Sequence, residues 1–370
     1  MSRSREDLLK EAKALRSWAE ARQLFHAIGG AGPRPAAGGG AEMFSAGGIE
    51  TLSRKPITAI GLNAERGEEG TIYVYTARQL NRAERKELEE AYPKTADVQF
   101  RQARPLTVDP GASPSPPPSG LSGQWTRYTC GSSISLGNVR EAGTLGCLLK
   151  DENGDIFGLS ANHVVGGCSN ARMGAPIVAP GIKDVGVGQP DPRTIGYYER
   201  AAPFVAGDPG VVPVKANCDA AVFKLIRPKE ISSWQGDYYD TPVDIGDPRE
   251  DADIEKVGRS TRLTQGLIES QVVGPHPVGF KTTVWHSSEE SVEFRATVYF
   301  DPVYVLRGKN RPFAAGGDSG SLVIQHEEGN RRTAVGILFA GKESDVSYML
   351  PLKPLLESLG MTLVSGHNPK

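Results

Sequence analysis

The most informative part of this sequence is the stretch Gly317-Asp318-Ser319-Gly320-Ser321-Leu322. It places a serine between two glycines and leads into an apolar run, Ser321–Gln325, that we expect to form a strand. A serine hydroxyl becomes a useful nucleophile only when a neighbouring base removes its proton. It also needs backbone N–H groups that stabilise the developing oxyanion. Gly-Asp-Ser-Gly can also be an ordinary turn. It indicates a catalytic serine only if the chain also supplies a base and a carboxylate.

A histidine at the end of a predicted strand supplies the candidate base. The strand is expected over Ile156–Ser160, and His163 follows it, whereas a lone histidine among the six in the chain is more often a core or surface residue. Asp219 comes directly before the apolar run Ala220–Ile226. A buried carboxylate is costly unless it has a partner. The N–H of a histidine ring would be such a partner, and the alternative is an aspartate in a turn.

The chain order His163, Asp219, Ser319 is the order found in chymotrypsin-type barrels. On this order and on six short motifs, the chain resembles the trypsin/chymotrypsin superfamily and, more closely, the Narrow-leaf-type peptidases. The motifs span most of residues 140–342 and are Gly143-Thr144-Leu145-Gly146, Asn162-His163-Val164, Cys218-Asp219-Ala220-Ala221, Lys256-Val257-Gly258-Arg259-Ser260-Thr261, Gly317-Asp318-Ser319-Gly320-Ser321-Leu322 and Val335-Gly336-Ile337.

The resemblance implies a mostly β fold of two six-stranded antiparallel barrels, with a small N-terminal α/β accessory domain. It implies that His163 is the general base, that Asp219 orients it and that Ser319 is the nucleophile. The backbone N–H groups of Gly317 and Ser319 would form the oxyanion hole. The expected function is that of a serine endopeptidase.

The resemblance also assigns the substrate side of the cleft. Phe313, six residues before the nucleophile, would lie at the base of the primary pocket, so a preference for Lys or Arg is not implied. Phe339, Ala340 and Gly341 would form the substrate-binding strand, and we expect a shallow or apolar pocket. In secreted relatives the aspartate before the nucleophile pairs with a freed N-terminus, so Asp318, preceded here by a long N-terminal region, would need another partner or solvent.

Glycine and proline patterns divide the chain, which has 44 Gly and 27 Pro, into segments. Residues 29–48 hold 10 of them and residues 109–123 hold 8, which favours two linkers. The segments are an amphipathic helix over 1–28 with a capping box at Ser4 and Asp7, a Gly/Ala/Pro linker over 29–48, a small α/β accessory domain over 49–108, a Pro-rich linker over 109–123 and a trypsin-like peptidase domain over 124–370.

The accessory domain is predicted to contain strands over Ile57–Leu62, Thr71–Ala77 and Asp97–Ala103 and a helix over Asn81–Tyr92. Such a unit is short for an independent core, so it should pack on the first helix, on the large domain or on another subunit. We expect the N-terminal region to regulate assembly or targeting, for instance by forming a homo-oligomer. A chain without residues 1–123 is expected to fold with altered assembly or activity.

Composition narrows the class of protein further. Lys plus Arg number 42 and Asp plus Glu number 44, a balance that argues against a nucleic-acid partner. No run of 18 apolar residues predicts a membrane span, and no secretory signal is recognised at the start. Four cysteines without an export signal favour a cytoplasmic or otherwise intracellular protein without a disulfide framework. No metal-ligand spacing is present, so we expect no metal or cofactor and a protein substrate as the partner.

Other interpretations stay open at this point. A protease fold can serve as a binding or scaffold module without turnover. An esterase or lipase is disfavoured, because no Gly-x-Ser-x-Gly elbow occurs and the residue order differs. Residues 171–217 form a long loop that either covers the cleft or is a passive insertion. Arg259 is expected in a structural ion pair, and residues 270–290, with His276 and His286, in a surface hairpin or loop.

Overall fold

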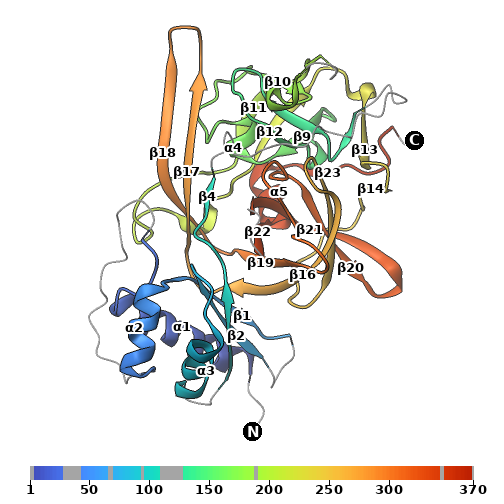
Figure 1. Cartoon of the computed structure of the whole chain (residues 1–370). Helices are drawn as coiled ribbons and strands as arrows, with labels where there is room; N and C mark the ends of the chain where they lie inside the picture. Colours follow the sequence, from blue (N-terminus) through green and yellow to red (C-terminus); the bar gives the residue numbers. More distant parts are fainter. Residues whose placement is uncertain are drawn as a thin grey trace.

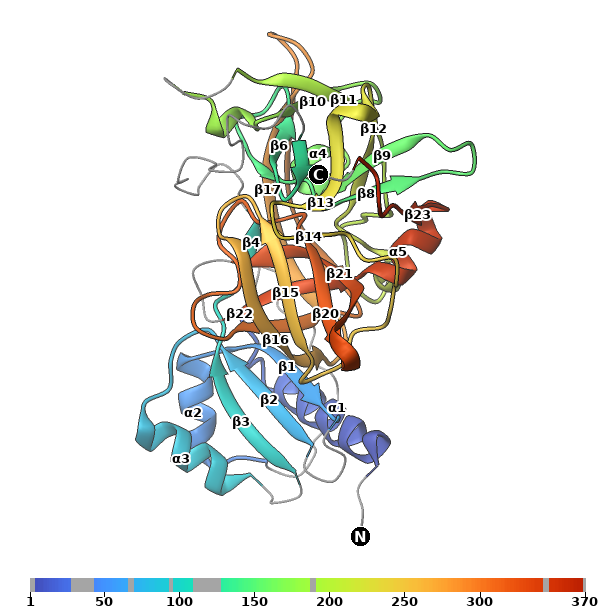
Figure 2. The same ribbon diagram turned by 90° about the vertical axis from the view of Figure 1, so that its right-hand side faces the viewer.

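The structure, a computed structural model, describes residues 4–27, 43–65, 70–92, 96–108, 128–186, 191–341 and 346–368. Its regular structure is mostly β-strand and forms an N-terminal α/β unit and two β domains (Figure 1). Figure 2 shows the N-terminal unit at one end, the second β domain in the middle and the first at the other end. This architecture confirms the predicted double-barrel fold class with an N-terminal α/β unit.

The N-terminal unit combines a small sheet with helices that cover it. Its elements are α1 (Arg5–Ala21), α2 (Ala46–Arg54), β1 (Ile57–Asn63), β2 (Thr71–Thr76), α3 (Arg82–Ala91), β3 (Asp97–Gln102) and β4 (Thr107–Val108). β1 and β2 are antiparallel, and α3 then carries the chain over to β3, which runs parallel to β2. Ser4 and Asp7 form the capping box expected for the first helix.

Two boundaries in this unit differ from the sequence-based expectation. α1 ends at Ala21 rather than near residue 28, because the chain turns at Gln23, where φ is 55°, and Phe25 then bridges to Ile57. Residues 43–48 are not a linker, since Phe44 is buried against Trp18 and α2 begins at Ala46. Residues 29–42 of the predicted linker and all of the second linker, 109–123, lie outside the described residues.

The first β domain is a curved antiparallel sheet. Its elements are β5 (Tyr128–Cys130), β6 (Ser133–Leu136), β7 (Gly143–Thr144), β8 (Cys147–Lys150), β9 (Ile156–Ser160), α4 (Asn162–Val165), β10 (Pro176–Ala179), η3 (Ile182–Asp184), β11 (Arg193–Ala201), η4 (Val214–Ala216), β12 (Ala221–Leu225), η5 (Pro228–Glu230), β13 (Ile231–Gln235), β14 (Tyr239–Asp240) and, from the C-terminus, β23 (Thr362–Leu363). The main sheet has the order β23-β8-β9-β12-β11-β10-β6-β7, and β7 leads into β8 across two residues. The chain thus joins β7, at one end of the sheet, directly to β8, the strand next to β23 at the other end.

The second β domain is a closed six-stranded barrel. Its elements are β15 (Asp253–Gly258), β16 (Arg262–Val272), β17 (His276–Trp285), β18 (Ser291–Phe300), β19 (Tyr304–Gly308), β20 (Leu322–Glu327), η6 (Glu328–Asn330), β21 (Arg331–Gly341), β22 (Val346–Pro351) and α5 (Leu352–Leu359). The order β15-β20-β21-β22-β19-β16 closes because β16 also pairs with β15. α5 begins directly after Pro351 and ends directly before Gly360, where proline and glycine favour the two ends of a helix.

β17 and β18 form a long hairpin that leaves the barrel and runs toward the first domain (Figure 1). Val284 of β17 lies in the hydrophobic core of that domain. At its base the hairpin is joined by β4, which pairs in parallel with Gly279 and Phe280. The hairpin thus connects the N-terminal unit, the barrel and the first domain.

The N-terminal unit and the barrel share one sheet and one core. β1 pairs with β16 at Gly61 and Leu62, so the small sheet continues the barrel wall. An added Cβ on Gly61 would lie 2.2 Å from Ser270 Oγ, so only glycine permits this approach. Tyr75 belongs to the same hydrophobic cluster as Tyr348 of the barrel. Removal of the N-terminal region would expose apolar surface of the barrel at this shared core, and folding of a chain without residues 1–123 stays a prediction.

His276 is buried rather than at the surface, although it does belong to a hairpin. It is 3% exposed and stacks on Tyr348, with ring centroids 4.9 Å apart. Burial, together with the charge of Arg16, lowers its pKa to about 3. The folded protein therefore keeps this imidazole neutral at pH values where an exposed histidine is protonated.

Acidification from pH 7 to pH 5 is expected to cost stability through His276. The unfolded chain takes up this proton near pH 6.5, whereas the folded chain does so only near pH 3. The stabilisation is thus present above pH 6.5 and is lost progressively as the pH falls toward 3. At pH 5 the free energy of unfolding is lower by about 2 kcal/mol than at pH 7 on account of this group. Urea unfolding of His276→Phe, which keeps an aromatic stack, should lack this loss, and His286→Phe should retain it. Identical pH dependence in all three proteins would contradict the assignment.

Candidate active site

His163 and Asp219 meet in the interior of the first domain. β9 ends at Ser160, and the one-turn helix α4 that follows carries His163. Asp219 lies two residues before the start of β12, the neighbour of β9 in the sheet. The Nδ1 atom of His163 lies 2.5 Å from Asp219 Oδ2, and the backbone N–H of His163 donates to Oδ1 at 2.9 Å. The two residues are 2% and 0% exposed, so the carboxylate has the partner that its burial requires.

The carboxylate determines how the imidazole can act. An ionised carboxylate only accepts hydrogen bonds, so the short contact places a proton on His163 Nδ1. In the neutral ring, Nε2 is then the acceptor. The pair therefore presents a proton-accepting nitrogen from a ring that Asp219 Oδ2 orients through Nδ1, while the backbone N–H of His163 holds Oδ1 of the same carboxylate.

Ser319 comes from the second domain and lies against the segment that carries His163. It sits in the loop before β20 and is partly exposed. Its carbonyl accepts from Thr144 N at 2.9 Å, and a Cβ on Gly320 would lie 3.0 Å from Ala161 N. The Ser319 hydroxyl donates to Phe339 O at 3.3 Å rather than to His163. Nucleophile–base hydrogen bonds are often long or absent before substrate binds.

Two carbonyl groups of the loop around Ser319 accept hydrogen bonds from serine hydroxyls, which fixes the direction of the neighbouring N–H groups. Gly316 O accepts from Ser260 Oγ at 2.6 Å, and Asp318 O accepts from Ser321 Oγ at 2.6 Å. In a trans peptide the N–H points opposite to the C=O. The N–H groups of Gly317 and Ser319 therefore face away from these bonds, and neither has a protein acceptor among the described residues. Gly317, with φ of 97°, adopts a conformation that favours glycine.

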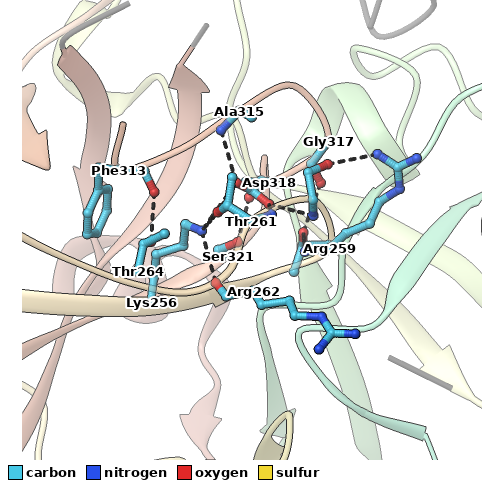
Figure 3. A network of polar contacts seen from close by, with 12 residues as sticks. Lys256, Arg259, Thr261, Arg262, Thr264, Phe313, Ala315, Gly317, Asp318 and Ser321 are labelled. Atoms are coloured by element: carbon cyan, nitrogen blue, oxygen red, sulfur yellow. Dashed lines mark hydrogen bonds and ion pairs between the residues drawn. The ribbon is translucent and has the colours of Figure 1, made fainter. Parts of the chain in front are cut away.

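Asp318 is fully buried and paired with Lys256, which answers the question of its partner (Figure 3). The Lys256 Nζ lies 3.2 Å from Asp318 Oδ2, and both side chains are 0% exposed. The carboxylate also accepts from Ser260 N, Thr261 N, Thr261 Oγ1 and Ala315 N. Burial alone would raise the pKa of Asp318, but the Lys256 charge and these donors outweigh it and lower the pKa. Asp318 is therefore ionised at neutral pH, while burial lowers the pKa of Lys256 against the raising effect of the Asp318 charge.

The residues predicted to contact substrate lie mostly inside the barrel. Phe313 and Phe339 are 1% and 0% exposed and belong to hydrophobic clusters, and Ala340 is also buried. Gly341 is partly exposed. In the described part of β21, the backbone of 339–341 pairs only with β22, which leaves its other edge without a strand. A substrate-binding role for these four residues stays a prediction.

An aromatic cluster that includes Phe280 and Phe300 of the hairpin lies beside His163. Phe280 of β17 has its ring centroid 6.1 Å from that of His163, and Phe204 packs edge-on against Phe280 at 5.0 Å. Phe300 of β18 extends the cluster to Phe339, at 5.2 Å. A side chain from the hairpin therefore packs beside the buried imidazole. Residues 171–217 are not one long loop, since they contain β10, η3, β11 and η4, and Phe204 of this stretch belongs to the cluster.

Sequence reasoning missed Lys256 and Phe280 as neighbours of the site. Lys256 stands two residues after Ile254 on β15, so its side chain shares the inward face of the barrel. A lysine at an inward position needs a buried acidic partner, and that pattern could have pointed to Asp318. Phe280 carries no comparable signal, because its position depends on how the hairpin crosses to the first domain.

Other site types are not seen in the described residues. No group of three or more His, Cys, Asp or Glu there is placed to hold a metal ion. The four cysteines are all free and buried. None of the helices in the described ranges is both long and apolar enough to cross a bilayer.

Comparisons with known proteins add a similarity of fold. No family model and no curated protein matches the chain. Among solved structures, Thermobifida fusca Protease A is 16% identical with a TM-score of 0.38, covering 65% of this chain and 100% of that one. The Nocardiopsis protease NAPase is 16% identical with a TM-score of 0.37, covering 64% and 98%. A glutamic acid-specific serine protease is 17% identical with a TM-score of 0.37, covering 64% and 100%. At these identities and TM-scores the comparisons carry no argument of their own, so the fold and the chemistry are both argued from the residues of this chain.

Proposed function

We propose that this protein is a serine endopeptidase that cleaves protein substrates through an acyl-enzyme intermediate. The observation that carries the proposal is the buried His163–Asp219 pair, with a glycine-flanked serine from the other domain packed against the same segment. Base, orienting carboxylate and hydroxyl are the three groups that this chemistry needs. His163 is the proposed general base, Asp219 its orienting partner and Ser319 the nucleophile.

In the first half of the reaction, His163 Nε2 takes the proton of the Ser319 hydroxyl as Oγ attacks the scissile carbonyl. The C=O π electrons move to the oxygen, and the N–H groups of Gly317 and Ser319 stabilise the resulting anion. His163 then gives the proton to the leaving amine as the C–N bond breaks, which leaves an ester on Ser319. Water repeats the sequence and releases the acid, with His163 again as base and then as acid.

The N-terminal region is proposed to regulate assembly or targeting of this enzyme, with a homo-oligomer as one route. β4 supports a regulatory role, since it pairs with β17 at Phe280, the residue that packs on His163. Within the class, the motifs listed for the Narrow-leaf-type peptidases favour that family. We propose protein substrates, with no role for nucleic acid, membrane, metal or cofactor.

The test is the degradation of casein, an unstructured protein, by the full chain and by Ser319→Ala. The wild type should produce fragments and Ser319→Ala none, because the variant lacks the attacking oxygen. Mapping the cleaved bonds by mass spectrometry should show no bias toward Lys or Arg, since Phe313 occupies the position at the base of the pocket.

The competing function is a catalytically silent binding or scaffold protein with a protease fold. Burial of His163 under Phe280 is the observation that favours it, because a covered base could not reach substrate. If neither protein degrades casein but both bind it equally, the scaffold is the better description. Equal degradation by both proteins would instead point to a contaminating protease.

A further inference from the structure

Two hydroxyl groups hold two consecutive carbonyl groups of the serine loop. Ser260 Oγ donates to Gly316 O at 2.6 Å, and Thr144 Oγ1 donates to Gly317 O at 2.9 Å. Ser260 belongs to the second domain, whereas Thr144 lies on β7 of the first domain. The orientation of the Gly317 peptide thus depends on groups from both domains.

Arg259 controls the direction in which both hydroxyls donate. Its Nη1 donates to Ser260 Oγ at 3.0 Å, and its backbone N donates to Thr144 Oγ1 at 3.0 Å. A hydroxyl has a single proton, so an oxygen that already accepts from one side directs its own O–H elsewhere. In both cases the remaining partner is a carbonyl of the serine loop. Arg259 therefore orders the Ser260 contact through its side chain and the Thr144 contact through its backbone N–H.

The guanidinium of Arg259 is itself anchored in the first domain. Its Nε and Nη2 atoms donate to the two oxygens of Asp184 in η3, and the two side chains are 1% and 0% exposed. Ser133 Oγ donates to the same carboxylate. Arg259 follows β15 of the barrel, so this bidentate pair joins the two β domains. It confirms the structural ion pair expected for Arg259.

Gly317 has no side chain and so leaves room for the guanidinium of Arg259. An added Cβ there would lie 2.0 Å from Arg259 Nη1 and 2.6 Å from Ser260 Oγ. Its φ of 97° lies in the region that side chains other than hydrogen rarely adopt. Guanidinium, hydroxyls and loop backbone form one packed unit (Figure 3 shows Arg259 beside Gly317 and Asp318).

We propose that Arg259 and Asp184 are positioning residues for the oxyanion site, acting through Ser260 and Thr144. With Gly316 O and Gly317 O fixed, the N–H of Gly317 is held opposite to Ser260, where an oxyanion could accept it. Because Asp184 and Thr144 come from the first domain, the site is ordered only while the two β domains are docked. The inference rests on the proposed function and adds residues to it that touch no substrate.

The test compares steady-state kinetics of the full chain with those of Ser260→Ala, Thr144→Val and Arg259→Gln, on a peptide taken from a mapped casein site. Loss of one oxyanion donor typically costs about 10²–10³-fold in rate. We expect kcat to fall about 10-fold for each hydroxyl variant and about 10²-fold for Arg259→Gln, with KM within about twofold of wild type. Arg249→Gln, which breaks an exposed pair with Glu327, is the matched control and should change neither constant.

A second readout separates positioning from general stability. A peptidyl trifluoromethyl ketone forms a tetrahedral adduct with the serine, so its inhibition constant should rise in parallel with the loss of kcat. Arg259→Gln leaves Asp184 unpaired and could fail to fold. In that case kcat and the inhibition constant of the double variant Arg259→Gln/Asp184→Asn and of the two hydroxyl variants test the inference. Unchanged kcat and inhibition constant with a lower melting temperature would overturn the inference. An inactive wild type would instead show that the proposed function is wrong.

Discussion

Asp219→Asn is expected to lower kcat by roughly 10⁴-fold while the protein stays folded. The amide oxygen can still accept from His163 N, which now donates to Oδ1 at 2.9 Å. The amide nitrogen then faces His163 Nδ1 and donates to it, so the ring carries its proton on Nε2. A ring in that state cannot take the proton of the serine hydroxyl. Steady-state cleavage of the casein-derived peptide measures the effect.

The control for this prediction is Asp155→Asn. Asp155 is an exposed carboxylate that pairs with Lys224 at 2.5 Å, and pairs of this kind contribute little. The same chemical change there should leave kcat unchanged. Circular dichroism should show that both variants keep the β structure of the wild type. Full activity in Asp219→Asn would remove Asp219 from the mechanism and with it the proposed triad.

Lys256→Met is expected to damage both stability and activity. The substitution leaves Asp318 charged, buried and without its cation, although the four N–H and O–H donors remain. Breaking a buried pair by removing one partner typically costs about 3–5 kcal/mol. Because Asp318 lies between the two proposed oxyanion amides, we expect the active fraction to fall together with the unfolding midpoint. Urea denaturation and peptide cleavage measure the two effects.

Two further variants sharpen the Lys256 prediction. Lys309→Met removes an exposed lysine that pairs with Asp253 at 2.8 Å and should change neither property. Lys256→Met/Asp318→Asn removes the unpaired charge and should regain a large part of the lost stability. A Lys256→Met protein as stable and active as the wild type would contradict the view that this ion pair holds the serine loop.

The sequence was sufficient for features that depend on local patterns. The strand over Ile156–Ser160 has the bounds predicted from its short apolar run, and the helix over Leu352–Leu359 lies between Pro351 and Gly360. The placement of His163 after one strand and Asp219 before its neighbour follows from the same patterns, because adjacent strands bring their ends together. The chemical roles of His163, Asp219 and Ser319 stay predictions.

Features that depend on distant parts of the chain were not predictable in this way. The pairing of Gly61 with Val272 joins segments more than 200 residues apart, and nothing in either segment specifies its partner. Burial of His276 depends on Tyr348, and burial of His163 depends on Phe280 of the hairpin. Asp184 showed no signal as the partner of Arg259, because it lies in a loop rich in Gly and Pro. In each case tertiary packing, rather than local pattern, sets the environment of the residue.

Reaction with a fluorophosphonate probe tests the central claim most directly, because such probes form a covalent bond with an activated serine oxygen. Intact mass and peptide mapping of the full chain should show one adduct, located on Ser319. Ser319→Ala should show none, and His163→Ala should react far more slowly, since the hydroxyl would lack its base. An unmodified wild type, or an adduct that forms equally in Ser319→Ala, would contradict the account.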